Sequence, residues 1–232
     1  MIQKNPEKKY KVIVTGATGM VGEGVAFECL QHPQIEEVLL VNRRPSGWSH
    51  PKLREIVHAD LMNLTPVESQ LKGYDACFFC LGTTSLGKSE KTYTRTTYDL
   101  TLHVAATLLK MNPSMTFCYI SGSGTDSSEK GSVMWARVKG KTENALLHLG
   151  FQRTYNFRPA VLTPTPGLKN TLPYYHYLGW LLPLIRTLAP NYITTLKELG
   201  QAMIAALLMG FDKHTIEVKD IKTLAKKYNE DV

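Results

Sequence analysis

The chain lacks the features that mark secreted, disulfide-bonded or membrane-spanning proteins. Its first residues, Met1–Tyr10, are polar and charged, so they do not form the apolar core of a signal peptide. The most apolar stretch, Leu172–Pro190, is interrupted by Pro173, Pro183 and Arg186, and it is too short and broken to span a bilayer. We therefore expect a cytoplasmic protein with no transmembrane segment.

Cysteine is scarce, with four residues among 232. Cys77 and Cys80 have the C-x-x-C spacing of metal and redox sites, but they lie in an apolar run that predicts a strand. Side chains three positions apart on a strand point to opposite faces, so this pair cannot readily bind a metal or form a redox couple. We predict no metal site. We interpret both residues, with Cys29 and Cys118, as small core residues in a reducing compartment.

Acidic residues are outnumbered, with 20 Asp and Glu against 27 Lys and Arg, and the net charge is +7. A basic chain attracts anionic partners, nucleic acids among them. The densest clusters, Lys8–Lys11 and Lys222–Lys227, lie near opposite ends of the chain, and the remaining charge is dispersed. We interpret this pattern as a solvated surface with a site for an anionic cofactor, and we predict no nucleic-acid partner.

Apolar strand patterns alternate with helical patterns along most of the chain. Near-continuous apolar strands separated by helices predict a parallel sheet that is covered on both faces. The expected fold class is α/β, a Rossmann-type doubly wound parallel sheet that binds ligands at the C-terminal ends of its strands. The expected strands are Val12–Thr15, Val38–Val41, Glu55–Ala59, Ala76–Leu81, Thr116–Ser121, Thr154–Phe157 and Thr215–Val218. The first expected helix follows the strand Val12–Thr15 and ends near Gln31. The others cover about Tyr98–Met111, Trp135–Leu149 and Thr195–Met209.

The pattern becomes irregular after Pro159, where four prolines precede a cluster of aromatic residues. We predict one domain over residues 1–232, in which residues 160–232 form a small C-terminal, substrate-side extension above the binding edge of the sheet. The aromatic residues are open to three interpretations, which are ordinary packing, a substrate pocket and a homodimer contact. They are Tyr174, Tyr175, Tyr177 and Trp180.

Glycines recur every third residue directly after the first strand, at Gly16, Gly19 and Gly22. The first lets the chain turn sharply, the second lets the backbone approach a pyrophosphate, and the third lets the helix pack closely on the sheet. The helix N-terminus then directs free N–H groups at the phosphates. The alternative is a glycine-rich turn without a ligand. We place Gly16 and Gly19 in a dinucleotide site, together with their neighbours Thr18, Met20 and Val21.

An acidic residue that would hold the ribose 2′-hydroxyl of NAD is missing at the end of the second strand. Arg43 and Arg44 stand there instead, and arginine pairs with phosphate through its planar fork of donors. We therefore expect NADP(H) as the cofactor, although a basic loop without a ligand remains the alternative. Asp60 and Leu61 follow the third strand, where the adenine edge is expected, and Asp60 equally suits a surface turn.

Several short motifs occur in a fixed order along the chain. They are T-G-A-T-G-M-V-G at 15–22, N-R-R at 42–44, A-D-L at 59–61, C-L-G-T-T at 80–84, S-G-S-G-T-D at 121–126, V-K-G at 138–140 and F-R-P at 157–159. On these motifs the chain resembles atypical short-chain dehydrogenases/reductases of the Tat-interacting oxidoreductase-like group, close to proteins described as nucleoside-diphosphate-sugar epimerases. The resemblance implies an NADP(H)-binding Rossmann domain. It places Leu81, Gly82 and Thr83 beside the cofactor riboses and Lys139 on the hydroxyls of the nicotinamide ribose.

The chain departs from the wider superfamily at the proton-transfer residue. The superfamily pattern is Tyr-x-x-x-Lys, with one helical turn between the pair, whereas here Trp135 precedes Lys139. An indole N–H only donates and cannot act as a general base. The superfamily serine position falls nearest Gly122, so Ser121 and Ser123 are the candidates, with Lys139, for a catalytic role.

The cofactor motifs and the missing tyrosine are compatible with two classes of function. One is an NADP-dependent oxidoreductase or epimerase-like enzyme that acts on an unidentified small molecule with another proton donor. The other is a non-catalytic NADP(H)-sensing or partner-binding protein. The missing phenol favours the second class, while the cofactor motifs suit both equally.

Overall fold

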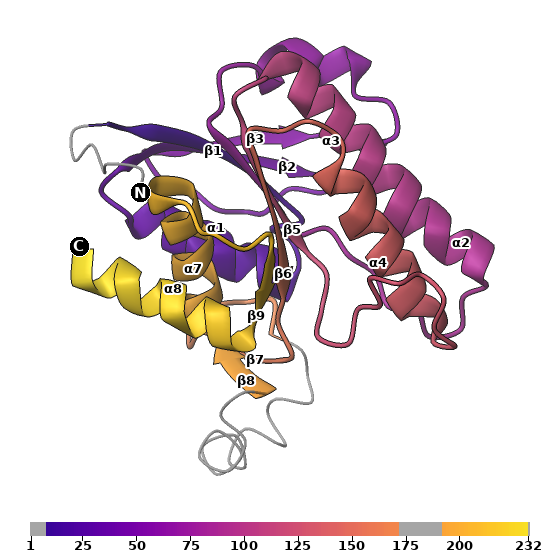
Figure 1. Cartoon of the computed structure of the whole chain (residues 1–232). Coiled ribbons are helices and arrows are strands. Elements are labelled where there is room, and N and C mark those ends of the chain that lie inside the picture. The colour runs from indigo at the N-terminus through magenta and orange to yellow at the C-terminus, as the bar shows by residue number, and fades with distance from the viewer. Residues whose placement is uncertain (1–7, 172–191, 232) are drawn as a thin grey trace.

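A seven-stranded parallel sheet forms the centre of the protein (Figure 1). The computed structural model describes residues 8–171 and 192–231. The strand order is β3-β2-β1-β4-β5-β6-β9, and every neighbouring pair is parallel. The strands are β1 (Tyr10–Thr15), β2 (Ile35–Asn42), β3 (Leu53–Val57), β4 (Ala76–Phe79), β5 (Thr116–Ile120), β6 (Arg153–Arg158) and β9 (Thr215–Glu217).

Helices cover both faces of this sheet, which confirms the doubly wound Rossmann-type fold (Figure 1). One face carries α1 (Met20–Gln31), α7 (Leu196–Met209) and α8 (Val218–Asp231). The other carries α2 (Glu90–Thr94), α3 (Leu100–Met111) and α4 (Met134–Leu147), and a 3₁₀ helix, Thr65–Leu71, adds to its core. The strands alternate between two cores, since Val12 and Val14 pack on the α1 side and Ile13 packs on the α3 side. Burial on both faces explains the near-continuous apolar strands.

The expected elements are present, with ends that differ by a few residues, and the structure adds others. A π-helical turn, Arg95–Asp99, joins α2 to α3, where the sequence pattern predicted one helix from about residue 98. The short strands β7 (Val161–Thr163) and β8 (Ile193–Thr195) form a separate parallel pair. The sequence analysis did not predict helix α8, because its lysines resemble a charged chain terminus. In the structure they belong to an amphipathic helix whose apolar residues are buried.

Much of the C-terminal region belongs to the main body of the protein. Strand β9 extends the sheet beyond β6, and α7 packs against α1 and α8. The β7–β8 pair stands apart from the main sheet, so the division at residue 160 remains a prediction. The aromatic cluster at 174–180, with its three interpretations, lies outside the described residues. Among residues 8–171 and 192–231, no helix has the length and apolar character needed to cross a membrane.

The cysteines are free thiols. Cys77 is buried in the core on the α3 side, whereas Cys80, which follows β4, packs against the core on the α1 side. The two side chains therefore face opposite sides of the sheet, as their spacing predicted.

The C-terminal ends of the strands form one edge of the sheet. From the neighbouring strands β1 and β4, the chain continues toward opposite sides of the sheet, which leaves a crevice between their ends. Helix α1 follows β1 to one face while the later helices α3 and α4 cover the other, so the sheet order reverses there. The backbone N–H of Cys80 donates to Thr15 Oγ1 at 3.2 Å, which joins the ends of β1 and β4. Ligands of open α/β sheets bind at such a switch point.

Candidate functional site

The glycine turn lies at this switch point, and its three glycines have different surroundings. Gly16 has a φ of +72°, and a Cβ there would lie 3.0 Å from the backbone of Cys80 and Leu81. A Cβ on Gly22 would lie 2.3 Å from the Gly16 carbonyl oxygen, so α1 packs on the turn itself rather than on the sheet as we expected. A Cβ on Gly19 would meet only that same oxygen, at an ordinary 3.5 Å. The protein therefore leaves space beside Gly19, which suits the approach of a pyrophosphate.

Asn42 fastens this turn to the end of β2. Its side-chain oxygen accepts from the backbone N–H of Ala17 at 3.0 Å, and its side-chain amide donates to Glu55 Oε1 at 2.9 Å. The same Glu55 oxygen accepts from the backbone N–H of Ser46 at 2.9 Å. A carboxylate therefore lies near the end of β2, although the sequence has no acidic residue there. It is Glu55 of β3, and it holds the backbone after β2. Sequence analysis missed both residues, because strand pairing alone brings Glu55 beside Asn42.

A cavity of about 310 Å³ lies beside the ends of β2, β3 and β4. Its lining includes six residues predicted to bind cofactor, which are Arg43, Asp60, Leu61, Leu81, Gly82 and Thr83. Asp60 Oδ1 also accepts from the backbone N–H of Met62 at 3.0 Å, which is the surface turn that the sequence allowed, and the contact with adenine stays a prediction. The π-helical turn contributes Thr96 to the same wall, and such turns are frequent at functional sites.

The two arginines that follow β2 line different cavities, and the second cavity also has a volume of about 310 Å³. Arg44 lines it together with Thr18, Pro45, Ser46 and Asn170, whereas Arg43 lines the first cavity. Both arginines are exposed. Neither forms an ion pair with a described residue, so both guanidinium groups are available to an anion.

Helix α4 holds the loop that follows β5. A Cβ on Gly140 would overlap the carbonyl oxygen of Asp126 at 1.8 Å, so the glycine of V-K-G is required where loop and helix touch. The backbone N–H of Asp126 donates to the Ala136 carbonyl at 3.1 Å, and the Lys139 ammonium donates to the Ser121 carbonyl. Burial lowers the pKa of Lys139 to about 8, and the nearby Glu143 carboxylate opposes part of that shift.

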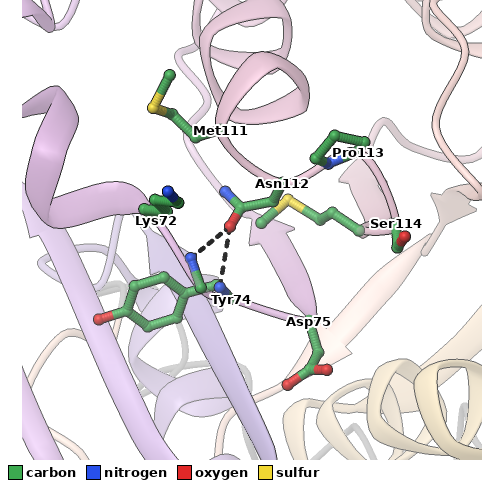
Figure 2. Close-up of a pocket in the computed structure, with 9 residues that line it drawn as sticks. Lys72, Tyr74, Asp75, Met111, Asn112, Pro113 and Ser114 are labelled. Atoms are coloured by element: carbon green, nitrogen blue, oxygen red, sulfur yellow. Dashed lines mark hydrogen bonds between the residues drawn. The ribbon is translucent and has the colours of Figure 1, made fainter.

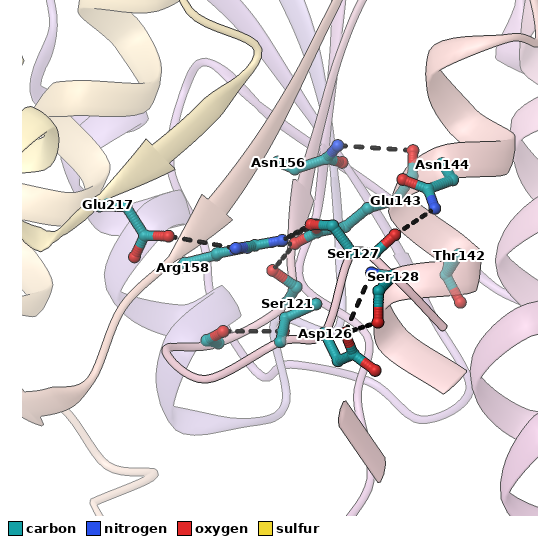
Figure 3. A network of polar contacts seen from close by, with 12 residues as sticks. Ser121, Asp126, Ser127, Ser128, Thr142, Glu143, Asn144, Asn156, Arg158 and Glu217 are labelled. Carbon is teal, nitrogen blue, oxygen red and sulfur yellow. Dashed lines mark hydrogen bonds and ion pairs between the residues drawn. The ribbon is translucent and has the colours of Figure 1, made fainter. Parts of the chain in front are cut away.

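Ser121 belongs to a buried polar network between α4, β6 and β9 (Figure 3). Its hydroxyl donates to Glu143, and the Phe157 carbonyl oxygen lies 3.2 Å from the same Oγ. Arg158 contacts both oxygens of Glu143, at 3.0 and 2.5 Å, and it also contacts Glu217 at 3.2 Å. The Ser121 hydroxyl thus has partners inside the protein, and its catalytic role stays a prediction. The sequence did not predict this pairing of Glu143 with Arg158, because the two residues belong to separate elements, α4 and β6.

Ser123, Trp135 and two nearby tyrosines are placed differently from Ser121. Ser123 is exposed, and its backbone N–H donates to the Pro159 carbonyl at 2.8 Å. The Trp135 ring reaches to 3.5 Å of the position that a Cβ on Gly124 would take, one helical turn before Lys139. Tyr93 is buried, with its pKa raised by desolvation. The ring of Tyr98 faces the Lys141 ammonium at 4.7 Å.

A third cavity, of about 350 Å³, lies at the opposite edge of the sheet (Figure 2). Its central residue, Asn112, accepts from the backbone N–H groups of Gly73 and Tyr74 at 2.7 and 3.0 Å. The Asn112 amide donates in turn to the Leu71 carbonyl at 2.8 Å. These bonds cap the C-terminus of α3 and hold the chain entering β4. We assign this cavity a structural role, since open parallel sheets bind ligands at their other edge.

Sequence comparison identifies related proteins. The model of the family "NAD dependent epimerase/dehydratase family" matches residues 12–130. Protein HTATIP2 of Rattus norvegicus is 29% identical over 65% of this chain and 62% of its own length. Protein fmp52, mitochondrial, of Emericella nidulans is 30% identical over 65% of this chain and 66% of its own length. These matches span just under two thirds of each relative.

Two solved structures share the fold. ADP-L-glycero-D-manno-heptose-6-epimerase of Helicobacter pylori has a TM-score of 0.64 at 14% identity, covering 97% of this chain and 84% of the epimerase. The Bordetella bronchiseptica enzyme WbmF, solved in complex with NAD+, has a TM-score of 0.64 at 15% identity, covering 97% and 79%.

The comparisons correct one expectation and confirm another. The expected cytoplasmic location is wrong on this evidence, because the fungal relatives are named as mitochondrial proteins. The resemblance to epimerase-like short-chain dehydrogenases/reductases is confirmed by the family match, which covers the glycine turn, both cavity-lining arginines and the loop after β5. The chain belongs to the NAD-dependent epimerase/dehydratase family.

Proposed function

We propose that this protein binds NADP(H) in preference to NAD(H) at the C-terminal edge of its sheet. The observation that carries the proposal is the arrangement around the glycine turn. Gly19 leaves open space beside the backbone, its neighbour Thr18 lines one cavity with Arg44, and Arg43 lines the other; neither arginine has an ion-pair partner among the described residues. A dinucleotide with an extra phosphate matches this combination of a phosphate-binding turn and excess positive charge.

The surroundings of the two arginines support the choice of NADP(H). The residue that precedes them, Asn42, is uncharged and uses its side chain to hold the turn. Glu55 is engaged by two N–H donors, so it is not arranged as a free acceptor for a ribose hydroxyl. The Glu55 carboxylate is therefore occupied in holding the backbone, while Arg43 and Arg44 remain exposed to an incoming phosphate.

The remaining residues suit the other parts of the cofactor. The first cavity, with Asp60, Leu61 and Leu81 in its wall, fits an adenosine. Lys139 lies beyond it, on the helix beside the loop after β5, where its ammonium suits ribose hydroxyls. The cofactor, when bound, supplies hydride transfer at its nicotinamide ring.

We further propose that native carbonyl reduction is weak or absent. Trp135 lies one turn before Lys139, where a tyrosine would transfer the proton, and its ring packs over Gly124. Tyr93 is buried and Tyr98 faces Lys141, so neither phenol replaces the missing one. General acid–base help contributes about 10²–10⁴ in rate. A cofactor-sensing or partner-binding role therefore fits this site better than the oxidoreductase or epimerase-like alternative.

Calorimetry with the purified full chain tests the cofactor. We expect NADPH to bind roughly ten- to a hundredfold more tightly than NADH, since a charged bidentate contact is worth about 1.5–3 kcal/mol. An Arg43→Ala/Arg44→Ala double variant should lose the preference and keep its NADH affinity. Equal affinities in the native protein would overturn the proposal.

Turnover assays test the catalytic part. We expect no NADPH oxidation above background with a panel of aldehydes, ketones and quinones. Trp135→Tyr would restore a phenol one turn before Lys139, and Trp135→Phe is its matched control. Vigorous native turnover that persists in Trp135→Phe would show that another residue transfers the proton.

We also propose a mitochondrial location, which rests on the names of the fungal relatives. Subcellular fractionation of cells that express the tagged full chain tests it, and recovery in the cytosolic fraction would contradict it.

A further inference from the structure

A buried carboxylate connects the start of α1 with a segment far along the chain. Glu23 lies in the first turn of α1 and is only 1% exposed. Its two oxygens accept from the backbone N–H groups of Lys169 and Asn170, at 3.0 and 2.7 Å. Charge-assisted bonds of this kind satisfy a carboxylate that burial would otherwise destabilise. Glu23 therefore fixes the 168–170 segment against the helix that begins in the glycine turn.

This anchorage brings Asn170 to the cavity that contains Arg44. Thr18 contributes from the glycine turn, Arg44 and Ser46 contribute from the segment after β2, and Asn170 contributes from the segment held by Glu23. The Ser46 backbone is itself fixed by Glu55. Two carboxylates outside the cavity thus hold segments that form its walls, and among residues 8–171 and 192–231 no carboxylate belongs to its lining.

The chemistry of the lining is specific for an oxyanion. It combines one guanidinium, two hydroxyls and one side-chain amide, all of which can donate hydrogen bonds. A phosphate monoester offers several acceptor oxygens and a charge that the guanidinium can neutralise. The cavity also adjoins the turn that is expected to take the pyrophosphate, so its ligand would be joined to the same cofactor.

We propose that Asn170 is a specificity-determining residue that closes the subsite for the cofactor's 2′-phosphate, and that Glu23 is its positioning residue. This inference rests on the proposed NADP(H) function. The C-terminal region then contributes to cofactor choice, in addition to the arginines after β2. An aspartate at position 170 would place a negative charge against the phosphate, whereas asparagine donates to it.

Two fragments of the cofactor isolate the subsite. Calorimetry of the full chain with 2′,5′-ADP and 5′-AMP compares ligands that differ only in the 2′-phosphate. We expect Asn170→Ala to weaken 2′,5′-ADP about tenfold and Asn170→Asp to weaken it further, because one charge-assisted hydrogen bond is lost or replaced by repulsion. Binding of 5′-AMP should stay within about twofold. Lys169→Gln is the control, since its side chain is outside the cavity lining and its N–H to Glu23 is retained.

The outcomes separate this inference from the proposed function. If the native protein binds both fragments equally, the NADP(H) preference itself fails. If the native protein prefers 2′,5′-ADP and both Asn170 variants keep the full preference, the subsite is closed by other residues and the inference is wrong. Glu23→Gln tests the positioning role, because glutamine offers one acceptor oxygen where two N–H groups need partners. A Glu23→Gln variant that stays folded and retains the native preference would refute that role.

Discussion

The ion pair between Arg158 and Glu143 offers the most quantitative test of the structure. The side chains are 11% and 2% exposed, and Arg158 contacts both carboxylate oxygens. Removing one partner of a buried pair leaves an uncompensated charge, which costs about 3–5 kcal/mol. Arg158→Met should therefore lower the free energy of unfolding by about that amount, with Tm falling by roughly 6–20 °C for a chain of this size.

A surface pair provides the matched control. Arg54 contacts Glu37 at 3.4 Å, but its side chain is 56% exposed. Exposed pairs contribute about 0–1 kcal/mol, so Arg54→Met should lower the free energy of unfolding by no more than that. The contrast between the two arginine variants isolates burial as the cause.

Urea unfolding of a double-mutant cycle completes this test. Glu143→Gln combined with Arg158→Met removes the buried carboxylate that Arg158→Met leaves without its guanidinium, so the double variant should be more stable than Arg158→Met alone. The reasoning is refuted if Arg158→Met costs no more than Arg54→Met, or if the effects of the two single substitutions simply add.

Three other results follow from the geometry of the site. Gly22→Ala should lower the free energy of unfolding by about 1–3 kcal/mol, because the new Cβ would lie 2.3 Å from a backbone oxygen; an unchanged urea midpoint would contradict this. Gly19→Val should leave that midpoint nearly unchanged and abolish NADPH binding, since Gly19 has an extended backbone and its Cβ would meet only an ordinary contact. The pKa of Lys139 is lowered to about 8, so NADPH affinity should fall as pH rises through 8 and the ammonium loses its proton; Lys139→Arg should bind without this pH dependence, and a flat native profile would exclude the ammonium from the site.

The sequence predicted elements whose signals are local. Apolar strands alternating with helical patterns indicated the doubly wound sheet, and the glycine spacing indicated the turn at the end of β1. Helix α8 was missed because the cluster Lys222–Lys227, with three lysines in six residues, resembles a charged terminus, while the apolar residues that make the helix amphipathic are spread between the charged ones. The π-helical turn was missed because its i-to-i+5 bonds leave no mark in hydrophobic periodicity.

The sequence by itself determined the class of fold and the position of the phosphate-binding turn, because periodicity and backbone freedom act within a few residues. Only the tertiary structure decided the functions of individual polar groups. It committed Ser121 to Glu143, placed Glu55 beside Asn42, and brought Asn170 to the cavity of Arg44. Each of these contacts joins segments that are separate in the chain, and burial requires each polar group to find whatever partner the packed elements bring near. No local sequence pattern encodes the hydrogen-bond partner of a buried polar group, so the partner can be identified only when the packing of strands and helices is known.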